Sequence, residues 1–192
     1  IGLKENESYF IMRFNAFTAH HDIGIKGFSL EQKNHLINIL EPFGKIFITT
    51  QKEIEPELER YKLKISQEKI HSLLYYATMF IGDSQTMTSE AAMLGTPSLK
   101  LNSFAGKLSV HNELEQKYQL CYSFLPYEID NMVKKIKELL NIPHLKQEWQ
   151  QRREKMLADK IDVTAFIVWF VENYPQSVKI MKENPDYQYR FK

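Results

Sequence analysis

The residues with the clearest chemical potential lie together between Gly82 and Pro97. An apolar run stops at Gly82-Asp83-Ser84, a turn of hydroxyl and amide side chains follows, and an Ala- and Met-rich helix ends at Gly95. Glycine just past a helix and proline soon after it are the residues expected where a helix stops. The segment therefore predicts a strand, a tight polar turn, a helix and a strand. In parallel α/β sheets such a turn lies at the carboxyl end of a strand, where ligands bind.

The turn Ser84-Gln85-Thr86 is predicted to bind an anion, because hydroxyls and free backbone N–H groups gather at a helix start, where the helix dipole favours negative charge. Simple capping by Ser84 or Thr86, worth about 1 kcal/mol, would explain the same pattern without a ligand. Glu90 favours ligand binding over simple capping. It lies about 9 Å along the helix from Ser84, and helical side chains lean back toward the helix start. Its carboxylate would accept hydrogen bonds from the hydroxyls of a sugar whose phosphate is held at the turn. A solvated charge is the alternative interpretation of Glu90.

Four other kinds of functional site are not expected, because the sequence lacks residues that each of them requires. A nucleophile elbow needs Gly-x-Ser-x-Gly, and Thr86 stands where the last glycine belongs. A P-loop ending at Gly106-Lys107 needs a glycine at the position of Leu101. The Gly-x-Gly-x-x-Gly pattern of dinucleotide sites is absent, so no cofactor is expected. His20-His21-Asp22 has no cluster of Cys or His partners, so no metal is expected.

The composition is that of an ordinary soluble protein, with 192 residues, 43% of them hydrophobic and 26% charged. A formal net charge of +1 argues against nucleic acid as a partner. Cys121 is the only cysteine, which indicates a reducing compartment, so we expect a cytoplasmic protein. The longest apolar stretch, residues 165–171, is shorter than the roughly 18 residues of a membrane-spanning helix, and no transmembrane segment is expected, with peripheral membrane association left open. The chain begins at Ile1 rather than Met, which suggests a piece of a longer protein.

Short apolar runs alternate with helical patterns along the chain, which indicates βα units. The expected strands are 9–14, 45–50, the run ending at 82, 98–101 and 121–124, with a short strand or an extended segment at 62–65. The expected helices are 30–40, 53–61, 66–77, the helix ending at Gly95, 110–117, 127–140 and 146–174. We therefore predict an α/β, Rossmann-like, doubly wound fold with a mostly parallel sheet of about six strands and C-terminal helices. Residues 1–145 would form the Rossmann-like domain and residues 146–192 a helical extension with a loosely packed tail.

The stretch from Phe80 to Pro97 resembles the C-terminal half of GT-B fold enzymes, especially the UDP-N-acetylglucosamine 2-epimerase group. Those enzymes carry Asp-Ser-Gly-Gly, then Glu-Glu-Ala, then Leu-Gly-x-Pro. The stretch is more similar still to a related family of glycosyltransferase-like proteins of bacteria and archaea. The resemblance implies that Ser84, Gln85 and Thr86 bind the nucleotide diphosphate and that Glu90 binds the ribose. Two features depart from the epimerase pattern: Gln85 and Thr86 replace glycines, and Ser89 replaces a glutamate.

The resemblance extends over the βα order from Tyr9 to Leu140. The epimerases contact phosphate with a His-Arg pair in the loop after the first strand; here His20 and His21 occupy that loop and Arg13 precedes it, so the placement stays open. The resemblance also implies a base site at residues 66–70. Lys107 follows the strand after Pro97, within reach of phosphate or sugar, although a plain surface lysine explains it equally well.

Together these features imply the UDP-sugar-binding half of a GT-B type glycosyltransferase in surface glycan synthesis. The catalytic residues stay unknown and are expected on a missing N-terminal Rossmann-like domain, onto which residues 146–192 would pack unless they pack on their own domain. Two alternatives remain: an enzyme like the UDP-N-acetylglucosamine 2-epimerases, and a non-catalytic nucleotide-sugar-binding module.

Overall fold

A five-stranded sheet organises the part of the chain that the computed structural model describes, residues 2–4, 7–15, 27–50 and 53–192. Its strand order is β2-β1-β3-β4-β5, and every neighbouring pair is parallel. The strands are β1 (Tyr9–Phe14), β2 (Lys45–Thr50), β3 (Met79–Gly82), β4 (Ser98–Leu101) and β5 (Cys121–Phe124). The predicted Rossmann-like α/β fold class is confirmed.

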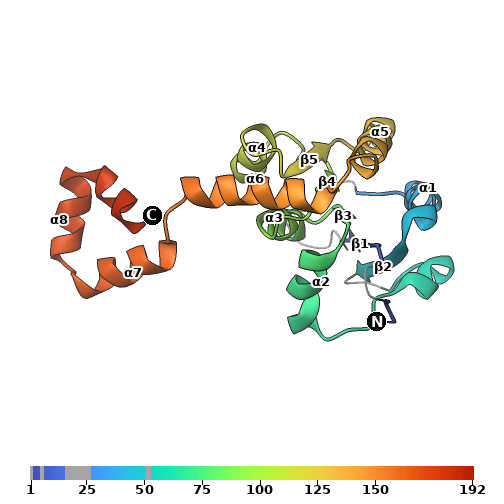
Figure 1. Ribbon diagram of the computed structural model, residues 1–192, viewed down its shortest axis with the longest axis horizontal. Coiled ribbons are helices and arrows are strands. Elements are labelled where there is room, and N and C mark those ends of the chain that lie inside the picture. The colour runs from blue at the N-terminus through green and yellow to red at the C-terminus, as the bar shows by residue number, and fades with distance from the viewer. Residues whose placement is uncertain (1, 5–6, 16–26, 51–52) are drawn as a thin grey trace. The chain divides into compact units, whose positions relative to one another are not determined.

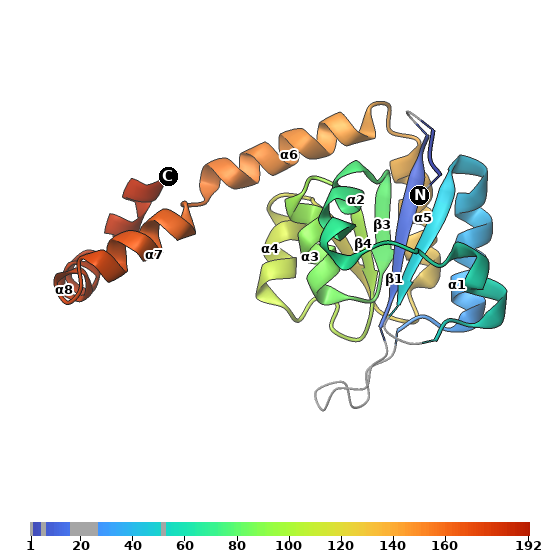
Figure 2. The ribbon, with the colours of Figure 1, turned by 90° about the horizontal axis from the view of Figure 1, so that it is seen from below.

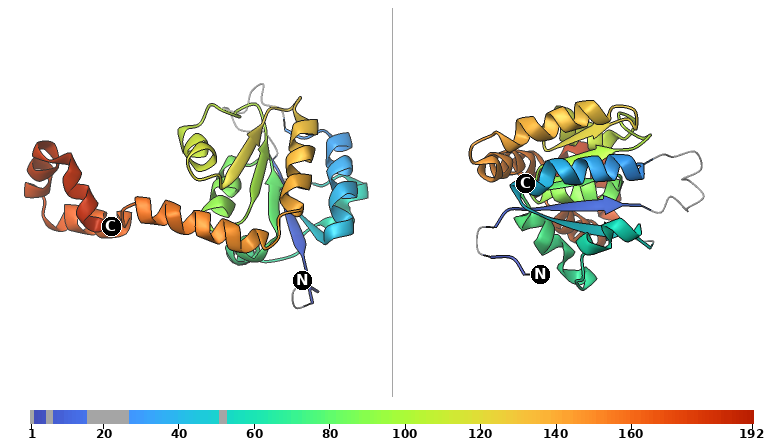
Figure 3. Two further views of the ribbon diagram at one scale, coloured as in Figure 1. Left: turned by 45° about the horizontal axis from the view of Figure 1, so that its top comes forward. Right: turned by 90° about the vertical axis from the view of Figure 1, so that its right-hand side faces the viewer.

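Helices cover both faces of this sheet (Figure 1). Helices α1 (Leu30–Leu40) and α5 (Ile129–Leu140) lie side by side on one face, as Figures 2 and 3 show from different directions. Helices α2 (Ile70–Tyr76), α3 (Gln85–Met93) and α4 (Ser109–Gln116) cover the other face. Since both faces are covered, the strands read as nearly continuous apolar runs rather than as alternating ones.

The core beneath α2 and α3 comes from alternate residues of the central strands. Tyr9 and Ile11 of β1 and Phe80 of β3 point to this face and pack against Leu74 of α2 and Ala91 of α3. All five side chains are buried. The small Ala91 allows α3 to lie close to the sheet, which brings the start of α3 near the ends of the strands.

Residues 53–69 differ from the sequence-based expectation. Of the two alternatives for residues 62–65, the structure has the extended segment, which forms one parallel bridge between Lys62 and Ile48. The described sheet therefore has five strands rather than about six. The expected helix 53–61 is a 3-10 helix over Pro56–Tyr61, with Pro56 in its first turn. A second 3-10 helix, Gln67–Lys69, precedes α2, which begins only at Ile70. These segments lie next to β2, the edge strand of the sheet. Their strand pairing with β2 is limited to the bridge at Lys62.

The chain divides into two compact units, Ile1–Arg153 and Glu154–Lys192. Helix α6 (Leu145–Asp159) contributes its first residues to the first unit, where Gln150 Nε2 donates hydrogen bonds to the carbonyl oxygens of Leu94 (2.9 Å) and Gly95 (3.1 Å). Arg153 Nε donates to Met93 O at 2.7 Å. These side chains satisfy carbonyl groups that the end of α3 leaves without helical partners. The functional division expected after residue 145 remains a prediction.

The second unit contains α7 (Val163–Glu172), α8 (Gln176–Glu183) and a 3-10 helix, Pro185–Phe191. Asp162 interrupts the single helix expected over 146–174, because its carboxylate caps α7 by accepting a hydrogen bond from Ala165 N at 2.9 Å. The tail was expected to be loosely packed, but Tyr187 stacks on Trp169 with ring centroids 4.7 Å apart. No helix in the described part of the chain is long and apolar enough to cross a membrane.

Gly82 ends β3 at a point of close approach. It pairs with Arg13 of β1, and a Cβ atom at Gly82 would lie 2.6 Å from the carbonyl oxygen of Arg13. A backbone atom cannot move aside as a flexible side chain does, so any larger residue would force β1 and β3 apart. Gly106, by contrast, has a φ of +75° but nothing within 4 Å of an added Cβ.

We therefore expect Gly82→Ala to lower the free energy of unfolding by about 3 kcal/mol or more. Gly106→Ala is the matched control and should cost only about 1 kcal/mol, because it introduces left-handed backbone strain without a clash. Urea unfolding of the two variants measures the difference. Equal losses would show that close approach does not require the glycine at position 82.

Candidate functional site

The candidate site lies at the carboxyl ends of β1 and β3. The chain passes from β1 to β2 on one side and then returns to place β3 on the other side of β1, so the strand order reverses there. In open parallel sheets, ligands bind in the crevice at this switch point. The residues that end the two strands are Arg13 and Phe14 on β1 and Gly82 on β3, with Asp83 directly after it.

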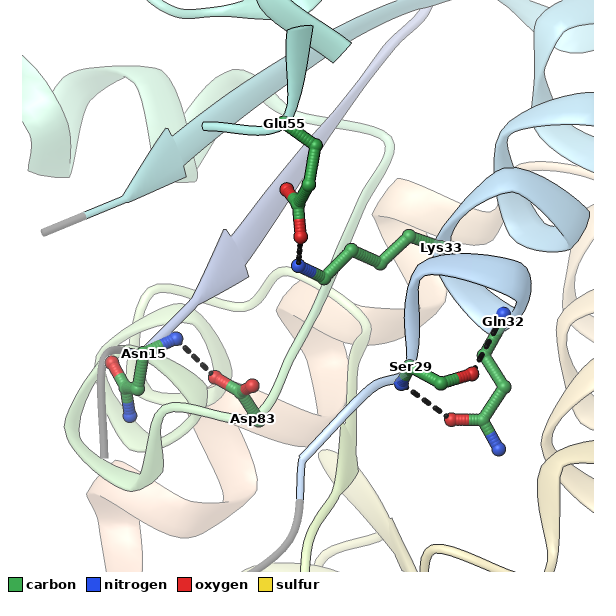
Figure 4. A network of polar contacts seen from close by, with 6 residues as sticks. All are labelled: Asn15, Ser29, Gln32, Lys33, Glu55 and Asp83. Atoms are coloured by element: carbon green, nitrogen blue, oxygen red, sulfur yellow. Dashed lines mark hydrogen bonds and ion pairs between the residues drawn. The ribbon is translucent and has the colours of Figure 1, made fainter. Parts of the chain in front are cut away.

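Asp83 joins these two strand ends (Figure 4). Its backbone N–H donates to Arg13 O at 3.1 Å, and its carboxylate Oδ1 accepts a hydrogen bond from Asn15 N at 2.7 Å. The carboxylate thus takes the place of the next backbone carbonyl in the β1–β3 ladder, which frees the chain to turn into α3. Asn102 Nδ2, just beyond β4, donates to Asp83 O at 2.9 Å and ties a third strand end to the same residue.

The Asp83 side chain is buried, and burial raises the pKa of its carboxyl to about 7 against a usual value of 3.8. The hydrogen bond from Asn15 and the positive charges of Lys33 and Arg13 act in the opposite direction. Lys33 is itself paired with Glu55, with 2.6 Å between Nζ and Oε1 (Figure 4). The strand ends therefore hold a carboxyl that is only partly ionised at neutral pH, among cationic groups.

Arg13 is a cation of this group whose nitrogen atoms are incompletely hydrogen-bonded. Its Nη1 lies 3.4 Å from Thr49 Oγ1, and its buried Nε has no hydrogen-bond partner among the described residues. Burial lowers the pKa of the guanidinium, while Asp83 opposes that shift. A buried guanidinium nitrogen without a partner suits a site that is completed by an anionic ligand.

Helix α3 begins next to Asp83. Ser84 is its cap: the hydroxyl accepts a hydrogen bond from Met87 N at 3.4 Å, while Ser84 O accepts one from Thr88 Oγ1 at 2.6 Å. Ser84 therefore caps α3, as the capping interpretation of this turn predicted. Gln85 and Thr86 are the first two helical residues, and helix geometry leaves their N–H groups without intrahelical acceptors. Thr86 is exposed and Gln85 half-buried.

A pocket of about 620 Å³ opens beside this turn, and three sets of residues line it. The ends of β1 and β2 contribute Arg13, Ile48, Thr49 and Thr50; the segment before α2 contributes Lys62, Leu63, Ile65 and Ser66; the helices contribute Ile70 and Met87. The pocket thus brings Arg13 together with Ser66 and Ile70 from the predicted base site and with Met87 from the first turn of α3.

The remaining predicted site residues lie outside the pocket wall. Glu90 is one turn beyond Met87 on α3, and its Oε2 is 3.5 Å from His71 Nε2, an exposed pairing across to α2. Lys107 is exposed on the loop after β4. His20 and His21 lie outside the described residues. Within the described ranges, no group of three His, Cys, Asp or Glu residues is placed to hold a metal ion.

Sequence reasoning missed Asp83, Asn15, Lys33 and Asn102 as residues of this site. Asp83 carried a usable signal, since it stands between Gly82 and Ser84 in the segment that the sequence singled out. The other three carried none, because they act on Asp83 from distant positions in the chain. Asn15 is 68 residues away, Lys33 is 50 and Asn102 is 19.

Comparison with known proteins supports the fold. The sequence matches no family model. It is 27% identical over 117 residues to DNA-directed RNA polymerase IV subunit 1 of Arabidopsis thaliana, which corresponds to 57% of this chain and 8% of that protein. The structure is similar to the glycotransferase of kitacinnamycin, with a TM-score of 0.51, 11% identity, and coverage of 79% of this chain and 39% of that one.

A UDP-N-acetylglucosamine 2-epimerase is also similar, with a TM-score of 0.49, 14% identity, and coverage of 76% of this chain and 38% of that chain. This chain therefore spans about two fifths of the solved structures that it matches. The similarity to the glycotransferase confirms the predicted resemblance to a GT-B-like domain at the level of fold, and identity this low establishes the fold alone.

The raised pKa of Asp83 predicts a pH-dependent stability. Between about pH 4 and pH 7 the folded state binds more protons than the unfolded state, so the free energy of unfolding falls as the pH rises through this range. Asp83→Asn keeps an acceptor for Asn15 but cannot titrate. We expect the variant to gain stability relative to the wild type as the pH rises, by at most about 1.4 kcal/mol per pH unit.

Urea unfolding between pH 4.5 and 8 measures this difference. Asp130→Asn, at an exposed position on α5, is the matched control and should leave the pH profile unchanged. Parallel profiles for the wild type and Asp83→Asn would contradict a raised pKa of the carboxyl at position 83.

Proposed function

We propose that this chain is the nucleotide-sugar-binding half of a GT-B type glycosyltransferase, with a UDP-sugar as the donor, acting in surface glycan synthesis. The observation that carries the proposal is the pocket of about 620 Å³ at the ends of β1 and β2, with Arg13 on its wall and the start of α3 beside it. A pocket of this size suits a small organic ligand. The pocket lies at the carboxyl ends of parallel strands, next to the switch point between β1 and β3, and nucleotides bind at such switch points in parallel sheets.

The pocket lining suits a nucleoside. Ile48, Leu63, Ile65, Ile70 and Met87 offer apolar surface for the faces of a base. Hydroxyl groups of Thr49, Thr50 and Ser66 line the same space and are able to hydrogen-bond to base edges or sugar hydroxyls. The backbone N–H of Leu63 is already used, since it donates to Ile48 O at 2.8 Å, so side chains rather than this part of the backbone would select the base.

The diphosphate would lie at the start of α3. The N–H groups of Gln85 and Thr86 would donate to it, with the helix dipole adding favourable potential. Arg13 would contribute a positive charge from the pocket side. Glu90 would exchange its pairing with His71 for the ribose hydroxyls. Lys107 and His21 would complete the phosphate contacts from the neighbouring loops.

The second half of the enzyme would come from outside this chain. The chain spans 39% of the glycotransferase that it resembles, which leaves room for another domain of similar size. That domain would be an N-terminal Rossmann-like domain carrying the acceptor site and the catalytic residues. The exposed apolar residues of α7, among them Val163, Ile167 and Val171, would then contact it.

The first test is direct binding. UDP should bind the 192-residue chain with a dissociation constant in the micromolar to millimolar range and raise its melting temperature. Isothermal titration calorimetry with UDP, TDP and GDP measures the affinity and the base preference. Absence of binding at millimolar concentrations of all three nucleotides would contradict the proposal.

The second test separates the ribose role of Glu90 from its surface pairing. Glu90→Ala should weaken UDP binding about tenfold and leave the melting temperature nearly unchanged, because the pairing with His71 is exposed. His71→Ala removes the same pairing while keeping the carboxylate, so it should preserve the affinity. Equal effects of both substitutions on binding would refute a specific ribose contact.

A further inference from the structure

A buried lysine and a buried histidine lie behind the first turn of α3. Lys100, on β4, is fully buried, and its Nζ has no hydrogen-bond partner among the described residues. His111, on α4, is 6% exposed. Neither residue lines the pocket, and neither belongs to the nucleotide site predicted from the sequence.

His111 holds the peptide group at the start of α3. Its Nε2 lies 3.0 Å from Gln85 O and 3.2 Å from Ser89 Oγ. A carbonyl oxygen only accepts hydrogen bonds, so Nε2 must carry the proton and donate to Gln85 O. The Ser89 hydroxyl also donates to Gln85 O, at 3.3 Å, and its oxygen is then available as a second acceptor for Nε2–H.

This contact acts directly on the proposed anion site. Gln85 O and the N–H of Thr86 belong to the same peptide group, and that N–H is one of the donors left free at the helix start. A hydrogen bond to the carbonyl fixes the plane of the peptide and polarises it, which makes its N–H a stronger donor. His111 therefore both orients and strengthens one donor of the site.

Lys100 supplies a positive charge in the same region. Burial is the main cause that lowers its pKa, to about 8, so the amine is still largely protonated at pH 7. The pKa of His111 is lowered, first by burial and second by the positive charge of Lys100. Both effects keep the imidazole neutral. The other ionisable neighbours are Glu115 on α4, whose pKa is raised by burial, and Cys121 on β5, whose pKa is raised to about 12.

A buried ammonium without a hydrogen-bond partner is costly to fold and is retained most readily where its charge serves a ligand. Lys100 is fully buried and acts electrostatically on His111, which contacts Gln85 O, so its charge is weakly screened by solvent. This charge is an observation separate from the helix terminus, and it favours the same sign of ligand.

We propose that Lys100 and His111 are positioning residues of the anion site at the start of α3: His111 orients and polarises the Gln85–Thr86 peptide, and Lys100 supplies positive potential behind it. The inference rests on the proposed function for the location of the phosphate groups. It adds that affinity for a diphosphate depends on two residues that do not touch the ligand.

Lys100→Met gives the sharpest test, because it removes the charge and keeps most of the side-chain volume. We expect its affinity for pyrophosphate and for UDP to fall about tenfold. Its melting temperature should stay the same or rise, since the charged form of Lys100 is disfavoured by burial. A purely structural role would lower stability and affinity together. Lys137→Met, at an exposed position on α5, removes the same charge from the surface and should change neither quantity.

Two variants test His111. His111→Leu removes the donor to Gln85 O and should weaken pyrophosphate binding at least fivefold, whereas His111→Gln can donate from its amide and should restore most of the affinity. In the wild type, pyrophosphate should raise the pKa of His111, measured from the ring nitrogen shifts by NMR, because a bound anion stabilises the imidazolium. This measurement needs no substitution and so does not depend on how well the variants fold.

The outcomes separate this inference from the proposed function. If UDP binds and Lys100→Met binds it equally well, the inference is overturned and the nucleotide site stands. If pyrophosphate binds and none of UDP, TDP and GDP does, weakened pyrophosphate binding by Lys100→Met supports the inference, while the nucleotide assignment fails. If the wild type binds neither probe, both are overturned.

Discussion

The link between the ends of β1 and β3 is the interaction on which the candidate site depends. Asp83 accepts a hydrogen bond from Asn15 N and donates one to Arg13 O, while Asn102 from the end of β4 bonds to its carbonyl oxygen. One residue therefore sets the positions of three strand ends. Without a side-chain acceptor at position 83, the N–H of Asn15 would lose its hydrogen-bond partner as the chain leaves β3 for α3.

The same link has an electrostatic consequence. Placing a carboxyl in this buried crevice raises its pKa to about 7, so at neutral pH it offsets the surrounding cations only in part. Arg13 keeps an unsatisfied Nε, and Lys100 contributes a second positive charge from behind α3. Buried cationic groups therefore gather at this edge of the sheet although the net charge of the whole chain is only +1. Local arrangement, and not overall composition, brings these charges together.

Much of the fold was accessible from the sequence because its signals are local. Apolar runs with helical patterns between them predicted all five strands of the described sheet, and the stop residues Gly95 and Pro97 marked the end of α3. Errors arose where local signals were weak. The edge segment 62–65 has strand-like residues but forms a bridge only at Lys62. The aromatic tail was predicted to be loosely packed, but Tyr187 stacks on Trp169.

By itself, the sequence determined the strand–turn–helix at Gly82 to Gly95 and the type of chemistry that such a turn supports, because capping, helix stops and apolar periodicity depend on neighbours in the chain. Only the tertiary structure decided which charges surround that turn. Asp83 meets Asn15, Arg13 lines the pocket, and His111 reaches Gln85 because parallel strands bring distant segments to one edge. Burial then shifts the pKa values of these groups, and burial is a property of the packed molecule that no single stretch of sequence carries.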